Sequence, residues 1–294
     1  MAQQTTTVNL SAVSNTVIKA ARYTAEFNAP SYQLCEAFNM PRGTNALRVP
    51  KVAKATIQQL VEGEDIVDEE DIGLSYVDLT TNEYGGKLIA TYRLIRQNGT
   101  TPIWQMVGRK FGEAGARIMD TTTQALYASL NGATVFGTTA LTMSLYNLAN
   151  NIAKAKAGAG ASGTPFNPSY VVHGPYGMLH LARSLSAIGA STNQLPPDEY
   201  QNKTLKNFWR QRVMGVEIYE SGNLVADSSS DITGVIAERS ALARIAEVGW
   251  TKGMTDDKSR RAWEFVFHSD WGVAELDDSL GAPLKFTAAA PSDT

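Results

Sequence analysis

The chain has 294 residues, of which 43% are hydrophobic and 19% charged, and its formal net charge at pH 7 is −3. This length and apolar content exclude a disordered tail and suffice for one large domain or two moderate ones. The balance of 26 basic against 29 acidic residues argues against a protein that holds nucleic acid mainly by charge. Soluble domains usually carry about 25% charged residues, so we expect much of this surface to be neutral or covered by other subunits.

The sequence contains one cysteine and one long uncharged stretch. Cys35 alone excludes an internal disulfide and a zinc site of paired cysteines. The first cation is Lys19, and no continuous apolar stretch follows the N-terminus, so we expect no signal peptide. Residues 121–153 carry no charge over 33 positions, but they include several asparagines and many threonines. We interpret them as packed interior or subunit contact rather than as a membrane span.

The first hundred residues predict an arm followed by a long loop. Small polar residues and proline breaks dominate residues 1–48, which is typical of an extended arm. Strand-like segments on either side of an acidic run predict a β-hairpin excursion over residues 50–101. The run holds seven carboxylates within ten residues and no cation: Glu62, Glu64, Asp65, Asp68, Glu69, Glu70 and Asp71. Such a run favours a solvent-exposed tip and could equally meet a partner's cations, so we treat these residues as candidate assembly contacts.

The clearest helical pattern opens at Pro102. Apolar residues recur there at spacings of three and four: Ile103, Val107, Phe111, Ala114 and Ile118. The pair at 131–132, Asn-Gly, predicts the C-terminus, which gives about 29 residues and roughly 43 Å. Gly108, Gly112 and Gly115 share one face, and each costs about 0.5–1 kcal/mol relative to alanine. Either an element packs closely against this face or the helix bends there.

The second half predicts a mixture of short helices and strands. A helix is expected around Leu141, Leu145, Leu148 and Ile152, and the glycine- and proline-rich residues 158–168 would mark a subdomain boundary. A strand at 170–172, a helix beginning at Pro175 and a turn at 196–197 follow. The best later strands are 213–219, 234–237, the alternating set at 263, 265 and 267, and 271–276. Strands and helices come in blocks rather than in strict alternation, which predicts the α+β class.

No pattern of residues identifies a catalytic, cofactor or metal site. Residues 158–163 spell G-x-G-x-x-G, but they follow a helical pattern instead of a strand and run into prolines, so we interpret them as a linker. The three histidines, His173, His180 and His268, lack the spacing of a helical zinc site. Cys35 has no activating neighbours, and a small buried hydrophobe is the better interpretation. A carboxylate or histidine site without a sequence signature stays open as the enzyme alternative.

The order of the parts resembles the major capsid proteins of tailed bacteriophages, whose fold is shared with herpesvirus capsids and encapsulins. The segments that carry the resemblance are 77–88 with its Tyr-Gly-Gly, the helix at 102–131, and residues 166–173, 213–219 and 271–276. The resemblance implies an N-terminal arm at 1–48 and an extended loop with its return strand at 49–101. It further implies a peripheral domain with a spine helix at 102–157, an axial domain at 158–262, and return strands with a tail at 263–294.

The same resemblance implies a structural coat protein that is not an enzyme. Such a chain would self-assemble into hexamers and pentamers of an icosahedral shell around double-stranded DNA, without cofactor, membrane or sequence-specific DNA binding. Its partners would be other copies, a separate scaffolding protein, a portal and decoration proteins, and it would reside in the virion after assembly in the host cytoplasm. We predict no crosslink between subunits. The alternatives are an encapsulin-like compartment with a cargo enzyme and a soluble enzyme.

Overall fold

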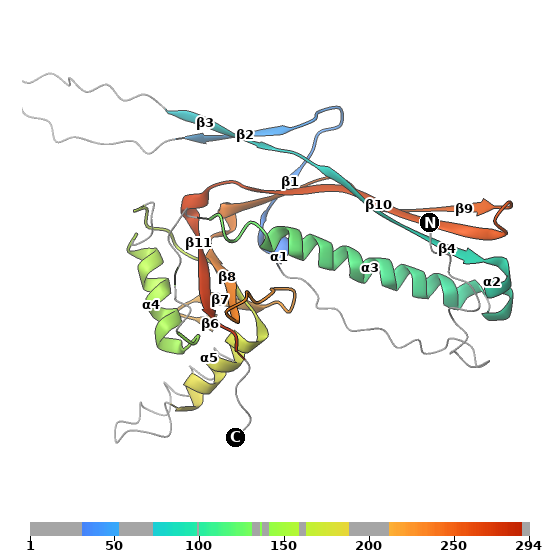
Figure 1. The fold of residues 1–294 in the computed structure, drawn as a ribbon. Helices are drawn as coiled ribbons and strands as arrows, with labels where there is room; N and C mark the ends of the chain where they lie inside the picture. The colour runs from blue at the N-terminus through green and yellow to red at the C-terminus, as the bar shows by residue number, and fades with distance from the viewer. Residues whose placement is uncertain are drawn as a thin grey trace, which may run out of the picture.

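The computed structural model describes residues 31–52, 73–98, 100–130, 136, 141–158, 163–187 and 212–289. Its helices are α1 (Ser31–Leu34), α2 (Tyr92–Asn98), α3 (Thr100–Gln124), α4 (Leu145–Lys156) and α5 (Pro175–Ala187), with short 3-10 turns η1 (Arg239–Ala241) and η2 (Asp278–Leu280). Its strands are β1 (Glu36–Asn39), β2 (Leu47–Val52), β3 (Leu74–Leu79), β4 (Asn82–Thr91), β5 (Tyr170–His173), β6 (Arg212–Val213), β7 (Val216–Glu220), β8 (Asp231–Ala237), β9 (Leu242–Asp257), β10 (Ala262–Glu275) and β11 (Gly281–Thr287). The predicted α+β class is confirmed (Figure 1).

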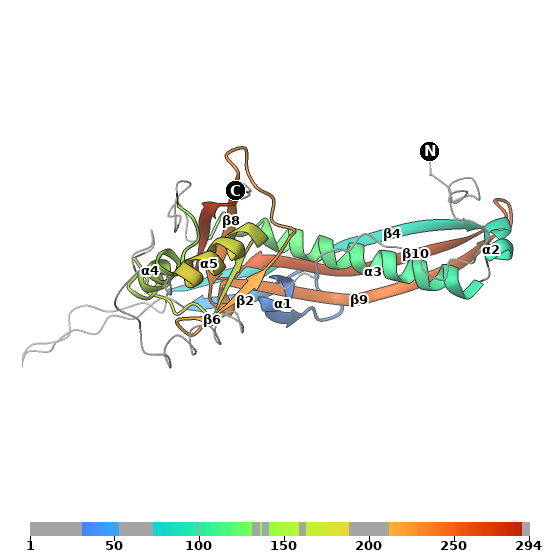
Figure 2. The same cartoon turned by 90° about the horizontal axis from the view of Figure 1, so that it is seen from below.

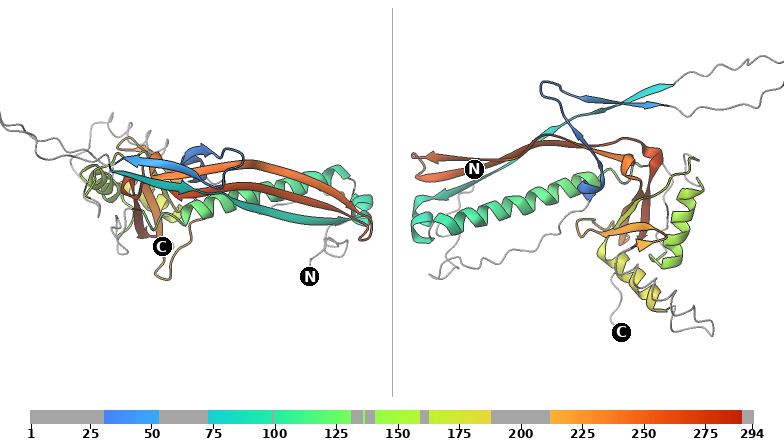
Figure 3. Two further views of the ribbon diagram at one scale, coloured as in Figure 1. Left: turned by 90° about the horizontal axis from the view of Figure 1, so that it is seen from above. Right: turned by 180° about the vertical axis from the view of Figure 1, so that it is seen from behind.

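A long four-stranded sheet and the helix α3 form one half of the molecule. The strand order is β1-β9-β10-β4, with β1 parallel to β9 and the other pairs antiparallel. The helix runs along the sheet, as Figure 2 and the left view of Figure 3 show. Val107 is buried there, and the Phe111 ring stacks on Phe267 with centroids 4.6 Å apart. A Cβ at Gly86 would overlap the Phe111 ring, so the helix approaches the sheet as closely as glycine permits.

A five-stranded sheet in the order β11-β8-β5-β7-β6 forms the other half. All four residues of its central strand β5 are buried, because both faces of the sheet are covered. Val171 packs in a cluster with Leu148 of α4 and Leu181 of α5. Its neighbour Val172 points to the opposite face and packs with Tyr127, just beyond the end of α3. Successive side chains of β5 therefore pack into two different hydrophobic clusters, one on each face of the sheet.

The third sheet is a two-stranded hairpin. Strands β2 and β3 pair antiparallel, with Leu47 opposite Leu79 and Arg48 opposite Asp78. β3 continues almost directly into β4, so the hairpin projects beyond the long sheet (Figure 1). The chain that joins β2 to β3, residues 53–72, lies outside the described residues.

The predicted long helix is correct in place but wrong in its ends. It begins at Thr100, two residues before Pro102, and ends at Gln124 rather than at residue 131. The hydroxyls of Thr121, Thr122 and Thr123 bond to the carbonyls one turn earlier, a bond that competes with regular helix geometry. Turns over residues 125–130 follow the helix, and they bury the side chains of Tyr127 and Leu130. A separate helix, α2, also replaces the end of the predicted hairpin excursion.

Several predicted elements are confirmed, and others have different bounds in the structure. Strand β5 and the helix beginning at Pro175 lie where the sequence predicted them, and α4 contains three of its four predicted residues but begins at Leu145, after Leu141. The segment 213–219 is two strands with a turn at Met214 and Gly215, whose φ angles are 49° and 84°. The two strands predicted over 263–276 are one, β10. The sequence did not predict β9, although it is the longest strand described, and the turn at 196–197 lies outside the described residues.

Candidate assembly surfaces

The hairpin β2–β3 presents apolar and paired charged side chains to solvent. Tyr76 is 55% exposed and Leu74 is 49% exposed. Arg48 donates two hydrogen bonds to Asp78, at 2.8 and 3.1 Å, and its guanidinium lies 5.4 Å from the centre of the Tyr76 ring. Because a two-stranded hairpin is marginally stable alone, exposed apolar side chains on it are suited to contact with another chain.

The acidic candidates fall outside the part of the chain that the structure describes. Glu62, Glu64, Asp65, Asp68, Glu69, Glu70 and Asp71 all lie between the ends of β2 and β3. The described strands Leu47–Val52 and Leu74–Leu79 place the two ends of this segment at the projecting end of the hairpin. Their role as assembly contacts stays a prediction.

The three glycines of α3 have different surroundings. A Cβ at Gly115 would lie 2.9 Å from the Trp250 ring of β9, so this position requires a close approach. Gly108 and Gly112 have open space on the side where a Cβ would point. Close packing thus accounts for one glycine of the predicted face and not for the other two.

The sequence did not predict the contact with Trp250, because it did not predict the strand β9 that carries this residue. Ile118, which was expected on the buried stripe, is 40% exposed.

Asp120 joins three segments that are distant in sequence. This carboxylate is fully buried and accepts hydrogen bonds from the backbone N–H of Ser31 at 3.1 Å and from Gln124 at 2.6 Å. It also accepts from the Ser221 hydroxyl at 2.7 Å and the Asn223 amide at 3.0 Å. The donors come from α1, from the end of α3 and from the loop after β7. Asp120 therefore ties the long helix to the half of the molecule that holds the five-stranded sheet.

The uncharged stretch at residues 121–153 contains both buried and exposed side chains. Its described part buries large side chains, namely Tyr127, Leu130, Phe136, Met143, Leu148 and Ile152. It also leaves Tyr146 of α4 79% exposed and Leu141 42% exposed. The packed-interior interpretation therefore holds for much of the described part, and subunit contact stays a prediction. The exposed pair makes the outer side of α4 a candidate contact surface.

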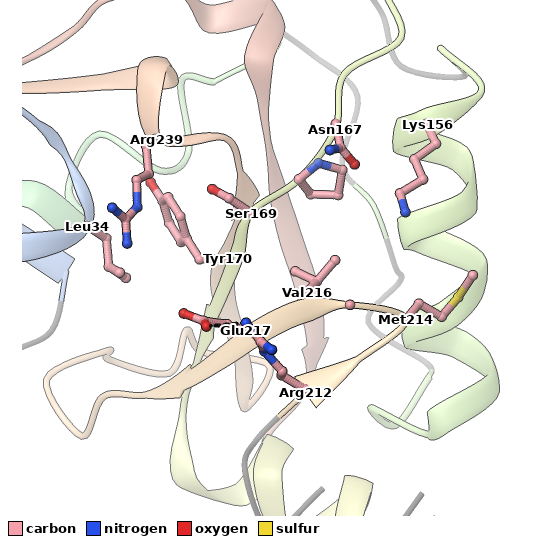
Figure 4. A pocket seen from close by; sticks show the side chains of 12 residues that line it. Leu34, Lys156, Asn167, Ser169, Tyr170, Arg212, Met214, Val216, Glu217 and Arg239 are labelled. Atoms are coloured by element: carbon pink, nitrogen blue, oxygen red, sulfur yellow. Dashed lines mark hydrogen bonds and ion pairs between the residues drawn. The ribbon is translucent and has the colours of Figure 1, made fainter. Parts of the chain in front are cut away.

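A cleft of about 490 Å³ opens between the end of α4, the hairpin β6–β7 and the turn η1 (Figure 4). Lys156, Arg212 and Arg239 line it together with one carboxylate, Glu217. Glu217 accepts from the Tyr219 hydroxyl and from Arg212, both at 2.7 Å, and these two bonds lower its pKa. A carboxylate whose pKa is lowered in this way is a weak base near neutral pH.

Cys35 and His173, two of the residues weighed for chemistry, are both buried. Cys35 is buried, and burial raises the pKa of its thiol to about 12, so it packs as a small hydrophobe. His173 is buried in β5, and burial lowers its pKa to about 4. Among the described residues, no three metal-ligating side chains come together, and none of the described helices is long and apolar enough to cross a membrane.

The complete fold matches solved bacteriophage capsids. The capsid of Helicobacter pylori bacteriophage KHP30 aligns with a TM-score of 0.69 and 10% identity, over 95% of this chain and 98% of that one. The chain has the fold of bacteriophage capsid proteins. The capsid of cyanophage P-SCSP1u aligns with a TM-score of 0.66 and 12% identity over 93% of each chain. The mature capsid of bacteriophage PhiM1 gives 0.64 and 14%, over 92% and 91%.

These capsid proteins share their fold with the chain but only 10–14% of their aligned residues. No family model matches the chain, and no curated protein matches it. The resemblance inferred from the order of the elements is confirmed by the fold. The exposed tyrosines described above, Tyr76 and Tyr146, lie on the projecting hairpin β2–β3 and on the outer side of α4.

Proposed function

We propose that the chain is the major coat protein of a tailed-bacteriophage capsid, a structural protein that assembles into hexamers and pentamers of an icosahedral shell around double-stranded DNA. The observation that carries this proposal is the alignment with the KHP30 capsid over 95% of this chain and 98% of that one. An alignment that spans both chains almost completely leaves little room for an added catalytic domain in this sequence. Fold and function are nevertheless separate questions, so the function needs its own test.

Features of the described surface support assembly. The hairpin β2–β3 and the outer side of α4 expose Tyr76 and Tyr146, which favours contact with other copies. The net charge of −3 suits a wall that does not condense DNA by electrostatic attraction. The expected location is the virion, after assembly in the host cytoplasm, and the expected partners are a scaffolding protein, a portal and decoration proteins.

The sheets support a division of the chain into two units. We assign the long sheet with α3 to a peripheral domain and the five-stranded sheet with α4 and α5 to an axial domain. Strand pairing places β9 with the long sheet and β11 with the five-stranded sheet. The boundaries from sequence, 158–262 and 263–294, would put these strands in the opposite units, so the proposed division follows the pairing instead.

The glycines of α3 support bending of this helix between an immature and an expanded shell. Gly108 and Gly112 are not explained by close packing, and glycine lowers the resistance of a helix to distortion. Replacing Gly108, Gly112 and Gly115 with alanine should slow or block expansion of the shell. Expansion at the rate of the unaltered protein would contradict this role.

The DNA content of purified particles tests the function. The proposal predicts shells that hold nuclease-protected double-stranded DNA when they are purified from infected cells. An encapsulin-like compartment would instead give DNA-free shells loaded with a protein cargo. A soluble enzyme would give no shell under any of these conditions, and that result would overturn the proposal.

A further inference from the structure

Four arginines gather around one hollow at the far end of the long sheet. The hollow has a volume of about 670 Å³ and lies between the start of α2 and the turn that joins β9 to β10. Arg93 and Arg96 come from α2, and Arg260 and Arg261 come from the turn. The backbone holds the two parts together, since the Tyr92 N–H donates to the Arg261 carbonyl at 2.9 Å. We call these four residues the arginine pocket.

Three of the four arginines of the pocket have no carboxylate partner among the described residues. Arg260 is paired with Asp257 at 3.5 Å and with Glu264 at 3.4 Å. Among the residues that the structure describes, Arg93, Arg96 and Arg261 form no ion pair with a carboxylate, and Arg96 bonds only to a backbone carbonyl. The pocket therefore attracts an anionic group from outside the described part of the chain.

The acidic run of the same sequence has the complementary charge. Glu62, Glu64, Asp65, Asp68, Glu69, Glu70 and Asp71 lie in the twenty residues that leave the hairpin after β2 and return at β3. Folded back on itself, a chain of twenty residues reaches at most roughly 35 Å from its ends. β3 and β4 carry the chain from Leu74 to Thr91, beside the pocket, over roughly 55 Å of extended strand. The run is therefore too short to reach the pocket of its own subunit.

We propose that the arginine pocket of one subunit binds the acidic run of a second copy, residues 62–71. The inference rests on the proposed function and specifies one contact within the shell. The pocket beside α2 and the end of the hairpin where β2 stops and β3 starts lie at opposite ends of the described structure (Figure 1). The proposed contact is therefore head-to-tail, and each subunit can provide the pocket to one neighbour and the acidic run to another. Packaged DNA is the other polyanion available, but phosphate binding would leave the acidic run without a counterpart.

Charge reversal in the assembly reaction tests the proposal. The variants are R93E/R96E, E69K/E70K and the combination of all four substitutions, each expressed with the phage's scaffolding protein if the unaltered chain needs it. R239E reverses an exposed arginine of the Figure 4 cleft and serves as the control. Urea unfolding of unassembled subunits shows whether each variant folds.

We expect each double variant to lower the yield of shells about tenfold or more, because like charges then meet at every contact. The combination should recover most of the yield, and R239E should keep it. Normal shell yield in R93E/R96E would overturn the inference, and so would loss of packaged DNA alone, which would identify a phosphate site. Failure of the combination to recover would also overturn it. Failure of the unaltered chain to form shells would count against the proposed function instead.

Discussion

Replacing Asp120 with alanine removes one acceptor from four donors, of which Ser31 and Ser221 are buried and Gln124 and Asn223 are half-buried. The buried N–H of Ser31 and the buried hydroxyl of Ser221 then lose the acceptor that Asp120 provides, whereas Gln124 keeps a 2.8 Å bond to the Ser221 oxygen and the half-buried Asn223 amide lies near solvent. An unsatisfied buried donor costs about 1–3 kcal/mol, so two of them lower the free energy of unfolding by about 4 kcal/mol. D120N keeps one oxygen at nearly the same place, and we expect it to cost about 2 kcal/mol.

The assay is urea unfolding of the unassembled subunit, followed by tryptophan fluorescence. D78A is the matched control, because Asp78 also accepts more than one hydrogen bond but lies in an exposed ion pair with Arg48, which contributes at most about 1 kcal/mol. Hydrogen exchange adds a local readout: D120A should speed exchange around residues 221–223 and leave the centre of β10 unchanged. If D120A destabilises the subunit no more than D78A does, the buried hydrogen bonds do not hold the two halves together.

Three further predictions concern α3 and β5. G108A should raise the free energy of unfolding by about 0.5–1 kcal/mol, because the new methyl group meets open space in a helix. G115A should lower it by about 1–3 kcal/mol by pressing on Trp250, and urea unfolding that ranks the two variants equally would contradict this. Burial keeps folded His173 neutral down to about pH 4, whereas the unfolded chain takes up this proton near pH 6.5. The free energy of unfolding should therefore decrease by about 3 kcal/mol as the pH falls from 6.5 to 4. H173N should flatten that pH dependence in urea titrations.

Sequence patterns predicted those elements whose apolar spacing survives in the final packing. The alternation of Trp263, Phe265 and Phe267 marks the face of β10 that packs under the long helix, and these side chains cluster there. The packing of Val171 and Val172 into different clusters on opposite faces of β5 likewise follows from the strand period. Local spacing determined these elements because their side chains point to the faces that the strand period assigns to them.

Elements held by partners distant in sequence were not predictable in the same way. Residues 249–257 of β9 are mostly polar and include two glycines, and they are extended because β10 pairs with them along its length. The buried position of Asp120 gave no local signal either, since its donors lie 89 and 101 residues away at Ser31 and Ser221. Arg93 and Arg261 meet only because α2 and the β9–β10 turn share one end of the sheet.

Electron microscopy of the particles formed by the expressed chain, with a scaffolding protein supplied, tests the central claim most directly. The proposed function predicts closed icosahedral shells in which hexamers and pentamers of one 31.7 kDa chain can be counted. A chain that folds but persists as a monomer in the presence of the scaffold would contradict it.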